Sequence, residues 1–135
     1  MIICANTKYG NIFVYDNDWI GSVLLRGDYF EEELINLILP NIRENSTVLD
    51  IGANVGVFSK AFLTKNCTVY AFEPQILLIN LLNKTFNNES NIIIKHNAIG
   101  DISKNVTMSL RDGNGNSFSE NGVINLGGIS IGFGG

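Results

Sequence analysis

The sequence predicts an α/β fold built around a parallel sheet, because strand-like apolar runs alternate with helical patterns in residues 47–99. Three short runs suit strands: residues 47–51, 67–72 and 92–98. Such an alternation gives parallel strands joined by crossovers, and we expect the three to lie side by side in the order 3-2-1. The first run is short and apolar, as expected of a strand that is covered on both faces.

The segments between these strands carry helical patterns. The first should bury four apolar side chains: Val57, Phe58, Ala61 and Phe62. The second has apolar residues four apart: Leu78, Leu82 and Phe86. Pro74 suits the first turn of this second helix, since the N–H that proline lacks has no helical partner there.

Residues 1–45 predict a β-hairpin and a helix that lead into the sheet. Turn signals at residues 9–11 and 16–18 flank a β-favouring run at residues 12–15. The helix should be capped by Asp28, with Glu31 completing a capping box. It should end near Pro40. Its apolar stripe would be formed by Phe30, Leu34, Ile38 and Ile42.

We expect one domain overall, because 135 residues leave no room for two. Within it, residues 1–45 form the lead-in, residues 46–101 the strand-helix repeat and residues 102–135 a glycine-rich tail. In the tail, a strand is expected from Asn105 to Leu110 and a weak one from Ile129 to Ile131.

Charge and composition exclude several kinds of partner. A net charge of −4, a pI near 4.8 and scattered basic residues argue against nucleic acid, because phosphate binding needs clustered Lys and Arg. No apolar run is long enough for a membrane span or a signal peptide, so a cytoplasmic protein without a membrane partner is expected. Cys4 and Cys67 suit neither a disulfide framework nor a metal site, and no metal is expected.

The loop after the first strand carries the main chemical signal. It runs from Asp50 through Gly52, Ala53 and Asn54 to Gly56. Its glycines permit a tight turn and a close approach of backbone to ligand, and the following helix presents unpaired N–H groups. A dinucleotide fingerprint would read G-x-G-x-x-G, but Asp50 stands where its first glycine belongs and would repel a diphosphate. The loop therefore suits a ligand without phosphate, such as S-adenosylmethionine.

Two further elements fall at the carboxyl ends of the next strands. Glu73 ends the second strand, 23 residues after Asp50, and its carboxylate could accept hydrogen bonds from both hydroxyls of a ribose. Asn97 and Ala98 end the third strand and could reach an adenine edge. Open α/β sheets bind ligands at this edge. Each residue alone also has a structural interpretation, Asp50 as a cap and Glu73 as a solvated turn residue, but together they predict a binding site.

These segments closely resemble the FkbM-type methyltransferase family. The resemblance rests on residues 48–56, on Ala71-Phe72-Glu73-Pro74 and on residues 97–101, and it covers most of residues 12–101. It implies a Rossmann-like methyltransferase fold and methyl transfer from S-adenosylmethionine, usually to a hydroxyl oxygen of a sugar or secondary metabolite. By position, the loop from Asp50 to Gly56 would line the methionine end, Glu73 would hold the ribose, and Asn97 and Ala98 would lie by the adenine.

The sequence departs from this family after residue 101. Members continue to a strand with a Lys-x-Asp-x-Glu-Gly type segment and have seven strands, which this sequence lacks. We therefore expect a truncated form that comprises the cofactor half of such an enzyme. Its first strand would have an unpaired edge, which suits pairing with a second copy of the chain.

No catalytic base is evident in the sequence. His96 is the only histidine, and a lone histidine on a strand is more often structural. Asp28, Glu31 and Glu32 suit a capped helix better than a lid over the methionine end, and Trp19 and Tyr29 suit packing better than an acceptor site. A non-catalytic binding or edge-pairing module and a nicotinamide dehydrogenase remain as rival functions, the second disfavoured by Asp50.

Overall fold

A computed structural model of the chain describes residues 1–106, 109–111, 117–119 and 124–128. Its centre is a parallel sheet of three strands: β3 (Thr47–Ile51), β4 (Thr68–Phe72) and β5 (Ile92–Lys95). β4 lies between the other two, with Leu49 opposite Tyr70 and Tyr70 opposite Ile93. The predicted strand order is confirmed, and the fold is α/β with one half of a Rossmann-like sheet.

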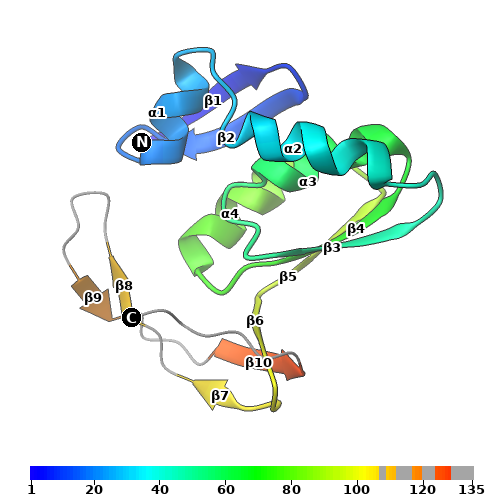
Figure 1. Cartoon of the computed structure of the whole chain (residues 1–135). Helices are drawn as coiled ribbons and strands as arrows, with labels where there is room; N and C mark the ends of the chain where they lie inside the picture. Colours follow the sequence, from blue (N-terminus) through cyan, green and yellow to red (C-terminus); the bar gives the residue numbers. More distant parts are fainter. Residues whose placement is uncertain (107–108, 112–116, 120–123, 129–135) are drawn as a thin grey trace.

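Two helices connect these strands and pack on one face of the sheet (Figure 1). α3 (Val57–Phe62) continues into a short 3₁₀ turn, η2 (Leu63–Lys65), and α4 (Ile76–Thr85) precedes β5. The expected buried side of α3 is confirmed, since three of its four residues are buried and Phe58 is partly buried. Pro74 lies one residue before the N-cap Gln75, so its predicted place in the first turn of α4 is wrong.

The sheet is covered by described helices on one face, which corrects the expectation of cover on both. Val69 and Ala71 point towards the helices and are fully buried. The alternate positions on the edge strand β3 point the other way, where Leu49 remains 50% exposed and Ile51 41% exposed. An apolar strand sequence therefore does not by itself show that both faces of the sheet are covered.

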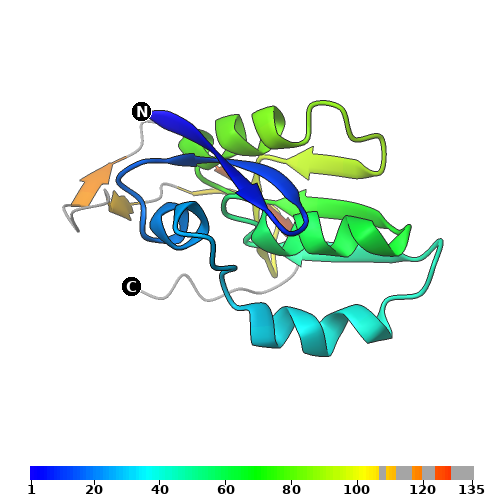
Figure 2. The ribbon, with the colours of Figure 1, turned by 90° about the horizontal axis from the view of Figure 1, so that it is seen from above.

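A β-hairpin forms a third layer on the side of α3 and α4 that faces away from the sheet (Figures 1 and 2). It consists of β1 (Ile2–Thr7) and β2 (Gly10–Tyr15), paired antiparallel with Ile3 opposite Val14. Ile12 and Val14 are fully buried and pack in the same cluster as Val55 and Leu81. The predicted hairpin is thus present and helps to bury the two helices.

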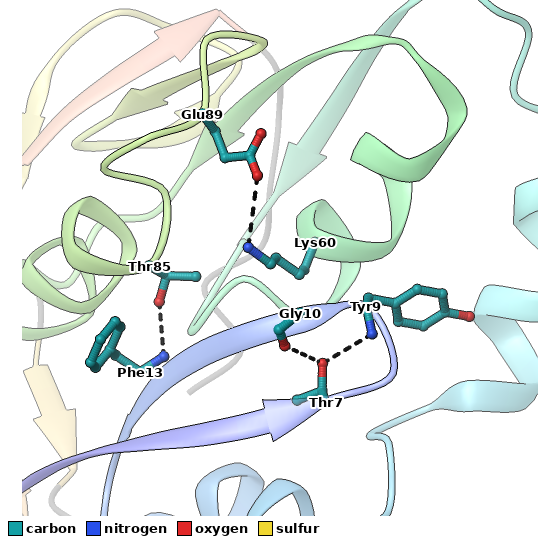
Figure 3. Close-up of polar contacts among 7 residues, drawn as sticks. All are labelled: Thr7, Tyr9, Gly10, Phe13, Lys60, Thr85 and Glu89. Carbon is teal, nitrogen blue, oxygen red and sulfur yellow. Dashed lines mark hydrogen bonds and ion pairs between the residues drawn. The ribbon is translucent and has the colours of Figure 1, made fainter.

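Polar contacts hold the hairpin in this place (Figure 3). The backbone N–H of Phe13 donates to the Thr85 hydroxyl of α4 at 3.0 Å. The ammonium of Lys60 lies 3.9 Å from a carboxylate oxygen of Glu89 and 5.3 Å from the centre of the Phe86 ring. A side chain on Gly10 would meet the end of Lys60, so the turn of the hairpin lies directly against α3.

A short helix, α1 (Trp19–Leu25), follows the hairpin and was not predicted. Asp18 caps it by accepting a 3.1 Å hydrogen bond from the backbone N–H of Gly21. Only seven residues form this helix, two of them β-branched, and the pattern in such a short segment is weak. Trp19 is 66% exposed and so lies outside the core, and the guanidinium of Arg26 packs over its ring at 5.9 Å from the centre, which fits the expected surface packing.

The next helix, α2 (Glu32–Ile38), begins later than predicted and lacks the capping box. Glu31 has a left-handed backbone with φ 53°, and Asp28 instead binds Arg26 at 2.8 Å. Three residues of the predicted apolar stripe, Phe30, Ile38 and Ile42, pack against the core. The stripe is wrong at Leu34, which is 44% exposed, while Ile35 beside it is fully buried. A 3₁₀ turn with Pro40 near its start, η1 (Leu39–Asn41), ends the helix as predicted.

The predicted strand over residues 92–98 divides at His96. β6 (Asn97–Gly100) leaves the first sheet and joins another, in which β10 (Ile124–Gly128) lies between β6 and β7 (Asn105–Val106). β8 (Ser109–Arg111) and β9 (Ser117–Ser119) form a separate antiparallel pair. Of the strand expected from Asn105 to Leu110, residues 105–106 lie on β7 and residues 109–110 on β8, whereas residues 107–108 and the strand expected at residues 129–131 lie outside the described residues.

Candidate functional site

The loop between β3 and α3 is fastened to the end of β4. The backbone N–H groups of Gly52 and Ala53 both donate to the carbonyl of Phe72, each at 2.9 Å. Gly56 closes the turn by donating to the carbonyl of Ala53, also at 2.9 Å. The loop therefore has a fixed conformation at the carboxyl end of the sheet, where ligands bind in open α/β folds.

Three residues of this loop have left-handed backbones, with φ of 78° at Gly52, 54° at Asn54 and 95° at Gly56. Asparagine tolerates this region better than most residues with a side chain. A Cβ on Gly56 would lie 2.7 Å from a ring carbon of Phe86, so glycine is needed there for space as well. A Cβ on Gly52 would meet nothing within 4 Å, which leaves open space beside this part of the loop.

Glu73 binds the loop through its carboxylate. One oxygen accepts from the backbone N–H of Asn54 at 2.8 Å, and the other accepts from the N–H of Gln75 at 3.0 Å. The residue is only 3% exposed. A carboxylate has about four acceptor sites, so each oxygen keeps a lone pair with which it can accept from a hydroxyl group. Burial raises the pKa of Glu73, while these two hydrogen bonds oppose the rise.

Asp50, at 8% exposed, forms the second buried carboxylate of the site. Its Oδ2 accepts a 2.6 Å hydrogen bond from the hydroxyl of Ser59, which is fully buried. Burial raises the pKa of Asp50, and the bond from Ser59 opposes this. The charge on Asp50 also raises the pKa of Glu73, so these two predicted carboxylates interact electrostatically.

Sequence reasoning missed Ser59, although a signal was present. Ser59 is a polar residue among the apolar residues of α3 that were expected to be buried, nine positions after Asp50. A polar side chain at a buried helix position needs a hydrogen-bonding partner. That requirement could have pointed to the carboxylate at the end of the preceding strand.

Asn97 and Ala98 lie on β6, beyond the break at His96, and so do not end the third strand of the first sheet. Asn97 is partly buried and Ala98 is 2% exposed. Ala98 pairs in register with Leu126 of β10, which makes it a member of the second sheet. β6 nevertheless contacts β4, the strand that directly precedes Glu73.

His96 fixes this break. Its Nε2 lies 2.8 Å from the carbonyl oxygen of Pro74, which joins the start of β6 to the segment after Glu73. The Nε2–H tautomer donates in this contact, because a carbonyl can only accept. The position supports the structural interpretation of His96.

Tyr29 also takes the structural role expected for it. It is buried, its hydroxyl donates to the carbonyl of Val57 at 2.5 Å, and its ring packs edge-on against Tyr9. Two of the acidic residues before and within α2 form ion pairs, Asp28 with Arg26 at 2.8 Å and Glu32 with Lys8 at 2.6 Å. Tyr29 therefore secures the first turn of α3, directly after the loop.

Two absences apply to the described part of the chain. Within it, no three His, Cys, Asp or Glu side chains group in a way that could hold a metal ion. The helices found there are also too short or too polar to cross a membrane.

The site has the features that a cofactor with hydroxyls and a cationic group requires. Two buried carboxylates supply the acceptors, and the space beside Gly52 admits ligand atoms close to the backbone. A phosphate group would instead face two negative charges at short range. The residues present therefore fit S-adenosylmethionine, which carries a ribose, an ammonium and a sulfonium and has no phosphate.

Solved structures that are similar to the chain include three methyltransferases. A protein assigned as an RNA methyltransferase from Pyrococcus horikoshii is 20% identical, with 53% of this chain and 38% of that chain covered, at a TM-score of 0.47. A methyltransferase assigned to an antibiotic biosynthesis pathway of Anabaena variabilis is 23% identical, with 56% and 32% covered, at 0.44. A tRNA methyltransferase of M. jannaschii is 23% identical, with 76% and 34% covered, at 0.49.

The chain spans about a third of the length of these three proteins. No family model and no curated protein matches it.

Proposed function

We propose that the chain is the cofactor-binding half of an S-adenosylmethionine-dependent methyltransferase. The observation that carries the proposal is the pairing of two buried carboxylates, Asp50 and Glu73, at the ends of adjacent strands, around a loop with open space beside Gly52. Asp50 would face the ammonium of the methionine end. Glu73, fixed by two backbone N–H groups, would accept from the ribose hydroxyls. Asn97 and Ala98 would border the adenine from β6.

When bound, S-adenosylmethionine supplies an electrophilic methyl group for in-line displacement. The chain's own residues then have to hold that group in line with the acceptor, since alignment supplies much of the rate. The loop from Asp50 to Gly56 suits this task because its hydrogen bonds to β4 give it a single conformation.

For the acceptor, we propose a hydroxyl oxygen of a sugar or secondary metabolite. The support is the resemblance of residues 48–56, 71–74 and 97–101 to the FkbM-type family. A cytoplasmic location accords with this proposal. A hydroxyl acceptor also has to lose its proton, which requires a general base. The contacts of His96 and Tyr29 are structural, so neither is assigned that role.

The rival proposal is a non-catalytic module that binds S-adenosylmethionine or pairs with a second copy through the edge of β3. The specific observation in its favour is that β3 is an edge strand whose outward residues Leu49 and Ile51 are half-exposed. Strands of this kind tend to pair with other chains.

Calorimetric titration of the purified chain tests cofactor binding. S-adenosylmethionine and S-adenosylhomocysteine should bind, while NAD should not. Replacement of Glu73 by Ala should weaken binding at least tenfold, as expected for lost hydrogen bonds to a charged group at about 1.5–3 kcal/mol. Glu33→Ala, at an exposed position of α2, serves as a matched control that removes the same kind of charge. Binding of NAD alone, or of no ligand, would refute the proposal.

Methyl transfer decides between the enzyme and the module. The chain should transfer labelled methyl groups from S-adenosylmethionine to sugar or polyketide hydroxyls. Binding without turnover on any hydroxyl acceptor would favour the non-catalytic module.

A further inference from the structure

Ser59 is fully buried on α3 and donates its hydroxyl hydrogen bond to Oδ2 of Asp50 at 2.6 Å. This distance lies in the range of charge-assisted O–H···O⁻ bonds, which are about twice as strong as neutral ones. The two residues are nine positions apart, on a helix and on the strand that precedes it. The contact therefore joins the end of β3 to α3 and spans the loop between them, which ends at Gly56.

The direction of this bond is informative. A serine inside a helix commonly returns its hydroxyl to a backbone carbonyl three or four residues earlier. Ser59 instead turns towards a carboxylate that is itself 8% exposed. Burial removes most of the water around this carboxylate, and the hydroxyl replaces part of that lost solvation. The hydroxyl therefore stabilises the ionised form of Asp50.

The bond also distinguishes the two carboxylate oxygens. The terminal torsion of aspartate is broad and nearly two-fold, so a free carboxylate samples many orientations. The hydroxyl donor on Oδ2 restricts that rotation and so orients Oδ1, which accepts from no other side chain among the described residues. Ser59 lies on a helix whose first turn is secured by Tyr29, so the donor is itself held in place.

We propose that Ser59 is a positioning residue for the cofactor, which holds the Asp50 carboxylate so that Oδ1 faces the ammonium at the methionine end. This inference rests on the proposed function and assigns a role to a residue outside the loop. Ser59 acts through Asp50 and does not itself contact the ligand. Its effect should accordingly be confined to ligands that carry the amino-acid end.

The test compares two ligands on wild-type chain, Ser59→Ala and Ser59→Thr. S-adenosylhomocysteine carries the aminocarboxypropyl group, whereas 5′-methylthioadenosine has the same adenosine and a methyl group in its place. Ser59→Ala should weaken S-adenosylhomocysteine about tenfold and leave 5′-methylthioadenosine unchanged. Ser59→Thr, which keeps the hydroxyl, should restore the ratio of the two affinities towards the wild-type value.

A pH profile of that ratio adds a second readout. Removing the hydroxyl raises the pKa of Asp50 further, because the bond from Ser59 opposes the effect of burial. On acidification, the preference for S-adenosylhomocysteine should therefore be lost at a higher pH in Ser59→Ala than in wild type. Glu73 also titrates, but it serves the ribose that both ligands share, so its effect cancels in the ratio.

The outcomes separate the inference from the proposed function. If Ser59→Ala weakens both ligands by the same factor, or neither, Ser59 has only a structural role and the inference is overturned while the proposed function stands. If wild-type chain binds neither ligand, the proposed function is refuted and the inference with it. A circular-dichroism melting curve for each variant shows whether a lost affinity reflects unfolding.

Discussion

The backbone N–H of Asn54 donates a 2.8 Å hydrogen bond to the carboxylate of Glu73, 19 residues further along the chain. The bond joins the loop after β3 to the residue that follows β4, so two segments of the site fix each other. The second oxygen of Glu73 accepts from Gln75 and thereby orients the start of α4. Glu73 is therefore both a candidate ligand contact and a structural part of the loop.

Replacing Glu73 by Gln should destabilise the chain. Both oxygens of Glu73 accept from backbone N–H groups, and the amide of Gln would have to present its own N–H to one of them. The unsatisfied donor costs about 1–3 kcal/mol. This cost exceeds what is gained by removing a buried charge. Urea unfolding at pH 7 should show a lower midpoint, and a midpoint at or above that of wild type would contradict the structural role.

Replacing Asp50 by Asn should have the opposite effect. Ser59 donates to Asp50 through its hydroxyl and its backbone N–H, and the carbonyl oxygen of Asn can still accept from the hydroxyl. Burial raises the pKa of Asp50 in the folded chain, so folding favours the protonated form. The stability that Asp50 contributes through its protonated form is fully present below the unfolded pKa of about 3.9. This stability is lost as pH rises through the higher pKa of the folded chain.

Asp50→Asn mimics the protonated carboxyl and should therefore be more stable than wild type at pH 7, by about 1 kcal/mol. The gain should vanish at acid pH, where wild type is protonated as well. Cofactor affinity should fall at least tenfold in the same variant. Equal stability of the two proteins at pH 7, measured by urea unfolding, would show that the buried charge has no cost.

The two glycines of the loop should respond differently to alanine. Gly56→Ala adds backbone strain at φ 95° and a Cβ at 2.7 Å from the Phe86 ring, for a loss of about 3 kcal/mol. The double variant with Phe86→Leu should recover part of this loss. A Gly56→Ala chain as stable as wild type would contradict the close contact.

Gly52→Ala is the matched control. Its Cβ enters open space, so only backbone strain at φ 78° of about 1–2 kcal/mol applies. The new methyl group occupies the space proposed for the ligand, so S-adenosylhomocysteine should bind at least tenfold more weakly. Unchanged affinity in a folded Gly52→Ala chain would place the ligand elsewhere.

The two cysteines should differ in reactivity. Cys4 is exposed, whereas Cys67 is buried, donates its thiol to the carbonyl of Phe62 at 3.1 Å and has a pKa raised by burial. A thiol reagent should modify one cysteine of the native chain rapidly and the second only after unfolding. Rapid modification of both would show that the cluster around Cys67 opens readily. Cys4→Ser identifies the fast site.

Features of the sequence that depend on local patterns could be predicted, whereas those that depend on distant partners could not. The order of β3, β4 and β5 follows from the alternation of strand and helix, which local periodicity reveals. Beyond His96, β6 instead pairs with residues of β10 that lie 28 positions further along the chain. Nothing in residues 92–98 themselves indicates it.

Short elements were the second source of error. α2 has seven residues, and the four-residue spacing of apolar residues pointed to Leu34 where Ile35 is buried. In the candidate site, Asp50 and Glu73 were predicted from their places at the ends of two strands. Ser59 became evident only when the structure placed its hydroxyl on Asp50.

The half-exposed outward face of β3 has a thermodynamic consequence. The heat-capacity increment of unfolding reflects apolar surface that water reaches only after the fold is lost, at about 12–15 cal/mol/K per residue. Leu49 and Ile51 are already about half hydrated in the folded chain and contribute less than buried residues would. This face of β3 therefore adds less to the heat-capacity increment of unfolding than a fully covered face would.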